Sequence, residues 1–313
     1  LKLRGIGTKK ADLFTDKSLQ RKFCKENGIC VPDFKLCESI DDAVVMLEKY
    51  KKIIIKPIDS QSSRGVYNIT SRKQLEEKYK DTIGWSNRRK VFLAEEYVDG
   101  AEFTIDGLVI NSHHYPLCIS VKEMYPENPN ISMMQSYSYT SDKYDYDLLR
   151  KTNRELIEAM GLPMGLTHCE YKFYKGKFYL IEAGARGGGS NLSGKIVPFM
   201  SGIDNYEYLI KEALGEPVDE EFVKNKEFSK KRYVIMRFFD FGEGTVEHIE
   251  GIEFLKNHPM LIDYQLEIKA GDELKEPAYG RLRPGHFIIG GDDKEKVIEE
   301  MEKILQKIKV VFK

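Results

Sequence analysis

The chain has 313 residues, 49 basic and 50 acidic side chains, and a hydrophobic content of 41%. This composition excludes a wholly disordered chain, and the net charge of −1 removes the broad electrostatic signal of a nucleic-acid binder. No apolar run approaches the roughly 18–20 residues that span a bilayer. Five cysteines without a CxxC pair favour a reducing compartment. We therefore expect a cytoplasmic protein with no nucleic-acid or membrane partner and, from length alone, about two domains.

Helices and strands are predicted to alternate in an α+β arrangement of hairpins and meanders rather than in a regular βαβ series. Capping residues mark several of the helix starts, and apolar residues at helical spacing indicate how far the helices continue. Predicted helices follow Asp16, Ser39 and Ser71 and cover 145–160 and 206–214. A last helix is predicted near the C-terminus, with an apolar stripe that ends at Ile308. The predicted strands cover 52–56, 66–69, 91–98, 102–110, 115–121, a hairpin over 166–184, and 233–239. The stretch 125–142 is predicted to be a long loop, which in a compact domain is usually functional or mobile.

A pair of carboxylates in the hairpin is the strongest chemical signal in the sequence. If the turn centres on Gly176, Glu170 directly faces Glu182 across the two strands. Opposed like charges destabilise a sheet, and a divalent cation such as Mg²⁺ removes that conflict. Neutralisation by Lys172 on a solvated face explains the pattern equally well. This register places Phe178 and Leu180 on the glutamates' face, and the opposite, apolar face consists of Cys169, Tyr171, Phe173, Tyr179, Ile181 and Ala183.

Two polar loops could bind an anion. The segment KPIDSQSSRGV follows an apolar strand, and its Lys56 and small residues offer a positive charge and backbone N–H groups to phosphate. Taken alone, such a loop is more often an ordinary hairpin connection. The segment ARGGGSN lets the backbone approach an anion closely, and its Arg186 could form a bidentate contact with a phosphoryl group. A flexible loop with a surface arginine is an equally good interpretation of that segment.

Taken together and in order, these segments resemble the ATP-grasp superfamily of ligases from about Asp16 to the C-terminus. The resemblance rests on TDK, IIIKPIDSQSSRGV, LAEEYVDGAEFTIDGLV and HCEYKFYKGKFYLIEAGARGGGS. The tail from YQLEIKAGDEL to GDDKEKVIEEME looks like the C-terminal subdomain of the biotin carboxylase and L-amino acid ligase branches. The resemblance implies an ATP-grasp fold with two α+β lobes that sandwich ATP and a strand-rich C-terminal subdomain. The expected boundaries are 1–97, 98–220 and 221–313, with the upstream domain of relatives absent or truncated.

The resemblance also implies roles for individual residues. ATP is expected to contact Lys17 and Lys56, the loop Ser62, Ser63 and Gly65 that closes over the phosphates, the adenine-reading hinge Glu95, Glu96, Tyr97 and Val98, and the ribose-binding Glu102. Glu170 and Glu182 are the implied ligands of Mg²⁺ or Mn²⁺, and Arg186 with Lys56 would stabilise charge on the γ-phosphate. Gly184 stands where many relatives carry a metal-binding asparagine, so Asn191 is considered as a substitute. His168, Gly188 and Asn191 are expected on the acceptor side.

The function implied by this resemblance is an ATP- and Mg²⁺-dependent carboxylate–amine ligase that works through an acylphosphate. Its partners would be a small carboxylate, such as an amino acid, and an amine, and a homodimer is left open. Two alternatives remain: a non-catalytic ATP-binding regulator on the same fold, or a purine-biosynthesis or carboxylase-type enzyme.

Overall fold

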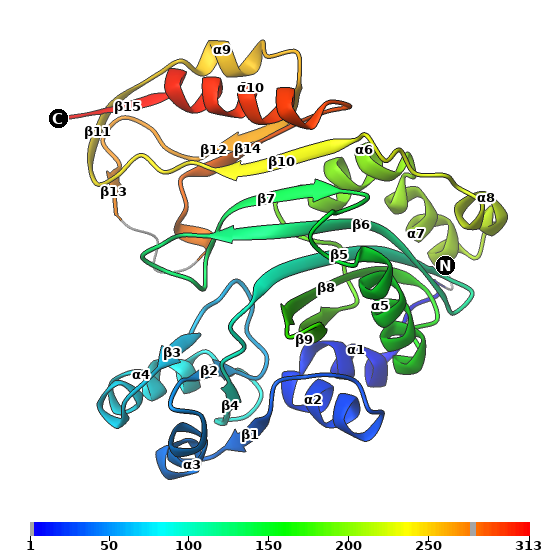
Figure 1. The fold of residues 1–313 in the computed structure, drawn as a ribbon, viewed down its shortest axis with the longest axis vertical. Coiled ribbons are helices and arrows are strands. Elements are labelled where there is room, and N and C mark those ends of the chain that lie inside the picture. The colour runs from blue at the N-terminus through cyan, green and yellow to red at the C-terminus, as the bar shows by residue number, and fades with distance from the viewer. Residues whose placement is uncertain (1–2, 276–279) are drawn as a thin grey trace.

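Three antiparallel sheets and their covering helices make up the computed structural model, which describes residues 3–275 and 280–313. Figure 1 shows a small sheet at one end of the molecule, a large sheet across its middle, and a third, short sheet near the C-terminus. All strand pairs recorded within the described ranges are antiparallel. The predicted α+β architecture is therefore confirmed.

The small sheet forms one lobe with its own core. Ile53 and Ile55 are fully buried on its inner face, where helices α3 and α4 pack against it. Ser39 begins α3 with a capping box, and Ser71 caps α4, as the sequence predicted. The strands, in spatial order, are β1 (Phe34–Cys37), β4 (Phe92–Glu96), β2 (Ile53–Pro57) and β3 (Tyr67–Ile69), and the helices are α3 (Ile40–Tyr50) and α4 (Arg72–Gly84).

The large sheet has eight strands and includes strands from both the middle and the C-terminal part of the chain. Its strands, in spatial order, are β12 (Leu261–Leu266), β14 (Gly285–Gly291), β10 (Tyr233–Phe238), β7 (Ser132–Ser138), β6 (His113–Met124), β5 (Ala101–Ile110), β8 (Gly165–Tyr174) and β9 (Lys177–Gly184). Because side chains alternate along each strand, this sheet has two distinct faces.

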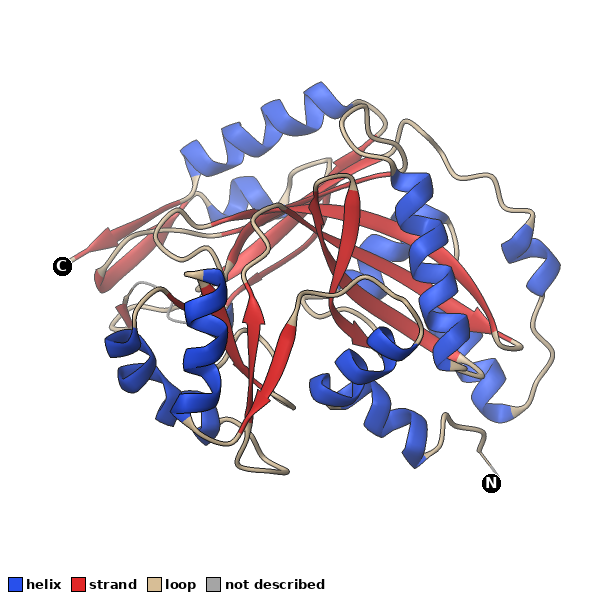
Figure 2. Cartoon of the chain, turned by 60° about the horizontal axis from the view of Figure 1, so that its bottom comes forward, coloured by secondary structure: helices blue, strands red, loops and turns tan. Residues whose placement is uncertain are grey.

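One face of the large sheet is covered along its length by helices. Phe103 and Tyr171 pack there with α1 (Thr8–Thr15), α2 (Lys17–Glu26) and α5 (Tyr146–Met160). At the other end of the same sheet, Phe287 packs with α9 (Ile252–Lys256) and α10 (Lys294–Lys307). In Figure 2 these helices stand apart from the helices of the small sheet.

The second face is only partly covered. A π-helical turn η1 (Leu192–Ile196), α6 (Val197–Ser201) and α7 (Asn205–Leu214) pack over one region of it. The rest of this face looks toward the small sheet and is where the charged side chains described below gather. The remaining elements are α8 (Glu220–Lys224), the third sheet of β13 (Glu273–Leu274), β11 (Gly244–Glu250) and β15 (Lys309–Phe312), and a 3-10 turn η2 (Gly280–Leu282).

One predicted loop is in fact partly a strand. Residues 132–138 of the stretch 125–142 form β7, which lies between β6 and β10 in the large sheet. Its polar composition hid it, because Ser132 and Gln135 face the interior of the molecule rather than solvent. Its partner β10 comes almost a hundred residues later in the chain, so the pairing of β7 with β10 cannot be predicted from a local sequence pattern.

The expected domain limits cut across continuous packing. Helices α1 and α2 lie in the expected N-terminal lobe, yet Phe14 and Cys24 are buried in the core of the large sheet. Strands β10, β12 and β14, expected in a separate C-terminal subdomain, extend that same sheet. No helix within the described ranges is both long and apolar enough to cross a membrane.

Candidate active site

The hairpin of β8 and β9 places Glu170 directly opposite Glu182, as predicted. A bulge beside Glu170 shifts the register of the two strands by one residue toward the turn. Both carboxylates stay on the open face of the large sheet, and both line a cavity. The bulge thus keeps the two glutamates paired, while the residues between the bulge and the turn pair in a register shifted by one.

The turn of this hairpin differs from the predicted one, and the apolar face of the hairpin therefore contains different residues. Lys175 and Gly176 form a two-residue turn, and both have positive φ. Phe178 and Leu180 are therefore buried in the core with Tyr171, and the prediction that they share the glutamates' face is wrong. The physical reason is the bulge, which lets the apolar side chains near the turn enter the core without moving Glu182.

Glu170 lies in a network of charges that comes from three neighbouring strands. Its Oε1 is 2.7 Å from Nζ of Lys122, which also lies 2.8 Å from Oε1 of Glu102. Nε2 of His168 is 3.6 Å from the same Glu170 oxygen, and its Nδ1 is 2.9 Å from Oδ1 of Asp106. Burial opposes the charge on Glu170, but Lys122 and His168 outweigh it and hold the pKa of this carboxyl well below its usual value.

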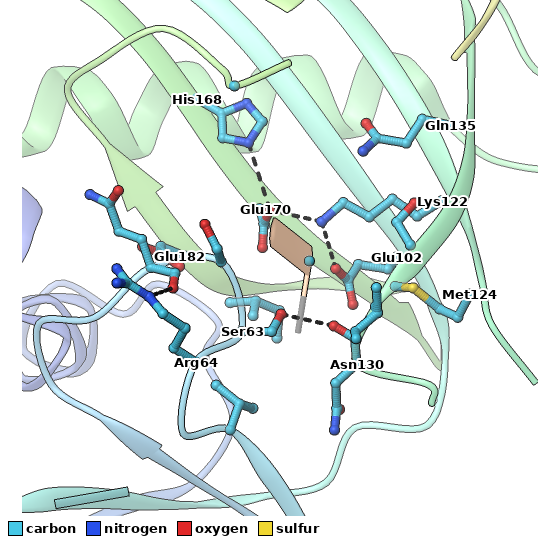
Figure 3. A pocket seen from close by; sticks show the side chains of 18 of the residues that line it. Ser63, Arg64, Glu102, Lys122, Met124, Asn130, Gln135, His168, Glu170 and Glu182 are labelled. Atoms are coloured by element: carbon cyan, nitrogen blue, oxygen red, sulfur yellow. Dashed lines mark hydrogen bonds and ion pairs between the residues drawn. The ribbon is translucent and has the colours of Figure 1, made fainter. Parts of the chain in front are cut away.

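The same contacts keep His168 charged. Burial disfavours the imidazolium form, yet Asp106 and Glu170 outweigh this effect and raise the pKa of His168 to about 9. A histidine in this state donates a hydrogen bond from both ring nitrogens. His168 is therefore a cationic donor inside the cavity, next to the hairpin glutamates (Figure 3).

Glu182 has a lysine partner of its own. Nζ of Lys17 lies 3.1 Å from Oε1 of Glu182 and donates a hydrogen bond of 2.7 Å to the carbonyl oxygen of Ser60. Lys172, which the sequence suggested as the partner of the glutamate pair, instead lies 4.0 Å from Glu102. The opposed carboxylates are thus neutralised by lysines from α2 and β6, which only the folded chain brings to them.

A buried ion cluster connects the small sheet to helix α2. The fully buried Arg21 forms a bidentate contact with Glu95, at 2.7 and 3.2 Å, and Nζ of Lys56 lies 2.6 Å from the second carboxylate oxygen. Although burial opposes the charge on Glu95, the two cations lower the pKa of its carboxyl. The side chain that was expected to read adenine is therefore occupied by Arg21 and Lys56.

The hinge residues after Glu95 alternate between the cavity and the outer surface. Glu96 and Val98 line the cavity. The ring of Tyr97 instead lies under Nζ of Lys52, at 3.4 Å from its centroid, away from the cavity lining. Only the first and third of these residues can place groups against a ligand in the cavity.

The loop expected to close over phosphate is tightly turned. Ser62, Ser63 and Gly65 all have positive φ, between 57° and 68°. At Gly65 a side chain is excluded, because a Cβ atom would lie 2.7 Å from Cδ1 of Trp85. Oγ of Ser63 donates a hydrogen bond of 2.8 Å to the carbonyl oxygen of Asn130, so this loop already contacts the connection between β6 and β7.

Arg186 follows the second glutamate and lines the cavity. Its guanidinium donates one recorded hydrogen bond, to the carbonyl oxygen of Gly187 at 2.8 Å. A Cβ atom at Gly184 would lie 3.4 Å from Cγ of Arg186, an ordinary van der Waals contact, so the arginine packs directly beside the glycine that stands in place of the expected asparagine.

The glycine-rich segment passes close to the histidine of the site. A Cβ atom at Gly188 would come within 3.1 Å of both Oδ1 of Asp106 and Nδ1 of His168, so only glycine fits there without movement. Asn191 lies outside the cavity lining, and its Nδ2 donates a hydrogen bond of 2.6 Å to Asp263 of β12. Its amide is thereby directed away from the two glutamates, and it is not placed as a substitute metal ligand.

A cavity of about 650 Å³ brings most of the predicted residues together. Figure 3 shows Glu102, Lys122, His168 and Glu170 along the large sheet, with Ser63 and Asn130 nearby. The predicted residues that line it are Lys17, Lys56, Ser62, Ser63, Glu95, Glu96, Val98, Glu102, His168, Glu170, Glu182 and Arg186. Those that do not are Gly65, Tyr97, Gly188 and Asn191.

Sequence reasoning missed several residues that organise this site. Arg21 had a local signal, because it lies one helical turn after Lys17 on the same face of α2. Lys122 and Asp106 had none, because their roles depend on which strands pair: Lys122 is the cross-strand neighbour of Glu102, and Asp106 is that of His168.

The carboxylates fit Mg²⁺ bound together with a nucleotide. Glu170 and Glu182 offer hard oxygen donors side by side, and Mg²⁺ commonly takes one or two carboxylates and completes its octahedron with phosphate and water. Within residues 3–275 and 280–313, no group of three or more His, Cys, Asp or Glu side chains forms a self-sufficient metal site. The donor set therefore suits a nucleotide-linked cation rather than a permanent structural one.

Comparison with protein families agrees with this geometry. Residues 50–193 match the ATP-grasp domain, and residues 237–313 match the L-amino acid ligase C-terminal domain 2. The crystal structure of L-amino acid ligase from Bacillus licheniformis superposes with a TM-score of 0.82 at 22% identity, covering 99% of this chain and 75% of that one. The fold is therefore an ATP-grasp fold.

Two curated proteins are similar in sequence over part of their length. Phosphoribosylamine–glycine ligase of Methanocella arvoryzae is 25% identical over 209 residues, which are 60% of this chain and 48% of the relative. D-alanine–D-alanine ligase of Pseudoalteromonas translucida is 24% identical over 153 residues, which are 48% of this chain and 47% of the relative. The chain thus spans about half the length of the curated relatives it matches.

Proposed function

We propose that this chain, which combines an ATP-grasp domain with an L-amino acid ligase C-terminal domain, is an ATP- and Mg²⁺-dependent carboxylate–amine ligase. The observation that supports this most strongly is the opposed pair Glu170 and Glu182, inside a cavity between the two sheets. The similarity to an L-amino acid ligase structure favours an amino acid as one substrate.

The cavity offers distinct places for the parts of ATP. The backbone of Glu96 and Val98 would hold adenine, and Glu102 would accept hydrogen bonds from the ribose hydroxyls. Lys17 and Lys56 would contact the phosphates. The Mg²⁺ held by Glu170 and Glu182 would neutralise phosphate charge. In the free protein the lysines satisfy the carboxylates, so ATP binding would exchange these ion pairs for contacts with phosphate.

The proposed reaction has two steps. An oxygen of the substrate carboxylate attacks the γ-phosphorus of ATP, the bond to the β,γ-bridging oxygen breaks, and ADP leaves from an acylphosphate. The amine nitrogen then attacks the acyl carbon, phosphate leaves with the bonding electron pair and takes up the proton that the nitrogen loses, and an amide remains. Arg186 and Lys56 would stabilise the charge of the transferring phosphoryl group. Closure of the loop containing Ser63 would exclude water, which hydrolyses such intermediates.

The activity is tested by incubating the protein with ATP, Mg²⁺ and a panel of amino acids, singly and in pairs. We expect ADP and phosphate release that requires both a carboxylate and an amine, together with an amide product seen by mass spectrometry. Calorimetric ATP binding without acceptor-stimulated turnover in the full-length gene product would instead favour a regulator. Turnover stimulated by bicarbonate would favour a carboxylase-type enzyme.

The charge on Lys56 predicts a pH dependence of ATP binding. Burial lowers the pKa of Lys56 to about 8, even though Glu95 favours its charged form. Only the protonated form attracts phosphate, so ATP affinity is expected to be constant below this pKa and to fall above it. A charge-assisted hydrogen bond contributes about 1.5–3 kcal/mol, which corresponds to a loss of about tenfold to a hundredfold.

Calorimetry between pH 7 and 10 measures this effect, and two buffers with different ionisation heats reveal proton uptake on binding near pH 8. The Lys56→Arg variant is the matched control, because arginine keeps its charge throughout this range. The same fall in affinity in both proteins would assign the titration to another group.

A further inference from the structure

Lys17 is the first residue of α2, and the loop that follows β2 holds it at both its backbone and its side chain. Its backbone N–H donates a hydrogen bond of 2.8 Å to the carbonyl oxygen of Ile58, and its Nζ donates one of 2.7 Å to that of Ser60. Strand β2 carries Lys56, the second lysine proposed to contact phosphate. The distance between the two ammonium groups therefore depends on how the start of α2 is fixed against this loop.

The residues on either side of Lys17 form a ring of hydrogen bonds with Arg89. Oδ1 of Asp16 accepts hydrogen bonds from the backbone N–H and the hydroxyl of Ser18, at 2.8 and 2.5 Å. Nη2 of Arg89 donates to Oδ2 of Asp16 and to Oγ of Ser18, both at 2.9 Å. Although burial opposes the charge on Asp16, these hydrogen bonds lower the pKa of its carboxyl. Both oxygens of the capping carboxylate are thus engaged, which fixes the orientation of the first turn of α2.

The backbone beside Arg89 is fixed to the same loop. Arg89 lies in the connection between α4 and β4, residues 85–91. The carboxylate of Asp59 accepts hydrogen bonds from the backbone N–H groups of Asn87 and Arg88, at 3.0 and 2.9 Å. The connection therefore links the loop after β2 to the start of α2, and Arg89 is the side chain that completes this link.

The neighbouring Arg88 makes a weaker contact of the same kind. Its Nη1 lies 2.6 Å from Oδ1 of Asp12 in α1, and the two side chains are 46% and 49% exposed. Arg89 is 47% exposed, but its partner Asp16 is only 5% exposed. An ion pair between two exposed side chains contributes little to stability, whereas a charged hydrogen bond to a buried carboxylate contributes more. The two arginines thus differ mainly in the burial of the group that they hold.

We propose that Arg89 is a positioning residue for Lys17. It holds the first turn of α2 so that the ammonium group of Lys17 meets the ATP phosphates together with that of Lys56. Lys17 and Lys56 line the cavity and Arg89 does not, so Arg89 acts through Lys17 rather than on the ligand. This inference rests on the proposed function, which assigns phosphate contacts to the two lysines.

Calorimetry of ATP binding with Mg²⁺ and without amino acids tests this role. Arg89→Gln is expected to weaken ATP binding about fivefold, the effect of losing one charged hydrogen bond that is half exposed to water. Binding of adenosine, which has no phosphate, should stay unchanged when measured by saturation-transfer NMR. Arg89→Lys keeps a cation with N–H donors and should recover most of the affinity for ATP. Arg88→Gln is the matched control and should bind ATP like the unchanged protein.

A double variant separates positioning from a general loss of structure. If Arg89 acts through Lys17, the double variant Lys17→Gln with Arg89→Gln should bind ATP as weakly as Lys17→Gln alone, because the second change has no ammonium group left to displace. Additive losses overturn the proposal. It is also overturned if Arg89→Gln weakens ATP and adenosine equally, if Arg88→Gln weakens ATP as much, or if only Lys17→Gln weakens ATP.

Amide hydrogen exchange, measured by NMR, reports the position of Lys17 without any nucleotide. The backbone N–H of Lys17 should exchange faster in Arg89→Gln than in Arg88→Gln, because its hydrogen bond to Ile58 opens more often. Unchanged exchange in Arg89→Gln overturns the positioning role. If exchange quickens but neither Arg89→Gln nor Lys17→Gln alters ATP affinity, the positioning of Lys17 stands and its proposed contact with ATP fails.

Discussion

Replacing Glu182 with glutamine is expected to lower turnover by about 10³-fold, while the fold is retained. The change removes one of two opposed carboxylates that would hold Mg²⁺, and a metal ion at a transferring phosphoryl group supplies several kcal/mol of stabilisation. Each 1.36 kcal/mol is about a factor of ten in rate. Steady-state release of ADP, with ATP and amino acids saturating, measures the effect.

The same variant has a readout that does not depend on turnover. Electron paramagnetic resonance of Mn²⁺ in the presence of ADP should show weaker binding of the cation. Glu123→Gln is the matched control, because Glu123 is an exposed carboxylate of β6 outside the cavity lining. If Glu182→Gln retains both Mn²⁺ binding and turnover, the hairpin is not the metal site.

The Glu95→Gln variant is expected to unfold more easily by about 3–5 kcal/mol, the range measured when a buried ion pair loses one partner. Glu95 is the carboxylate between Arg21 and Lys56, and all three side chains are buried. Its removal leaves two cations without a counter-ion in the interior. Urea denaturation followed by circular dichroism measures the change in the free energy of unfolding.

A second variant separates the ion cluster from a general packing defect. The double variant Arg21→Met with Glu95→Met removes a cation and the anion together and should lose less stability than the two single losses combined. A loss of under about 1 kcal/mol in Glu95→Gln, the scale of exposed pairs, would mean that the cluster does not hold α2 to the small sheet.

The residues that were predicted well are those whose signal is local. Asp16 caps α2 through Ser18 and Leu19, and Ser39 begins α3 with a capping box, because capping depends on residues two or three positions away. The opposed glutamates were predicted from a turn centred on Gly176, and their pairing holds because the bulge beside Glu170 offsets the two-residue turn of Lys175 and Gly176. The bulge that moves Phe178 and Leu180 into the core was not, because it depends on the helices that cover the other face.

The residues that were missed depend on contacts between distant parts of the chain. Strand β7 pairs with the preceding β6 and with β10, which comes almost a hundred residues later, and Lys122 becomes important only because it lies between Glu102 and Glu170. Arg283 lines the same cavity, although it lies more than a hundred residues after Glu170 in the chain. Local sequence patterns thus predict individual helices and strands well. Which residues meet in the site depends on the order of the strands in the large sheet.

The most direct test of the proposed acylphosphate uses a carboxylate substrate labelled with ¹⁸O in both carboxyl oxygens. If the carboxylate attacks ATP, one labelled oxygen leaves with phosphate when the amine displaces it, and mass spectrometry of the released phosphate finds one ¹⁸O atom per amide formed. Phosphate that carries no label while amide accumulates would contradict the acylphosphate and, with it, the proposed function.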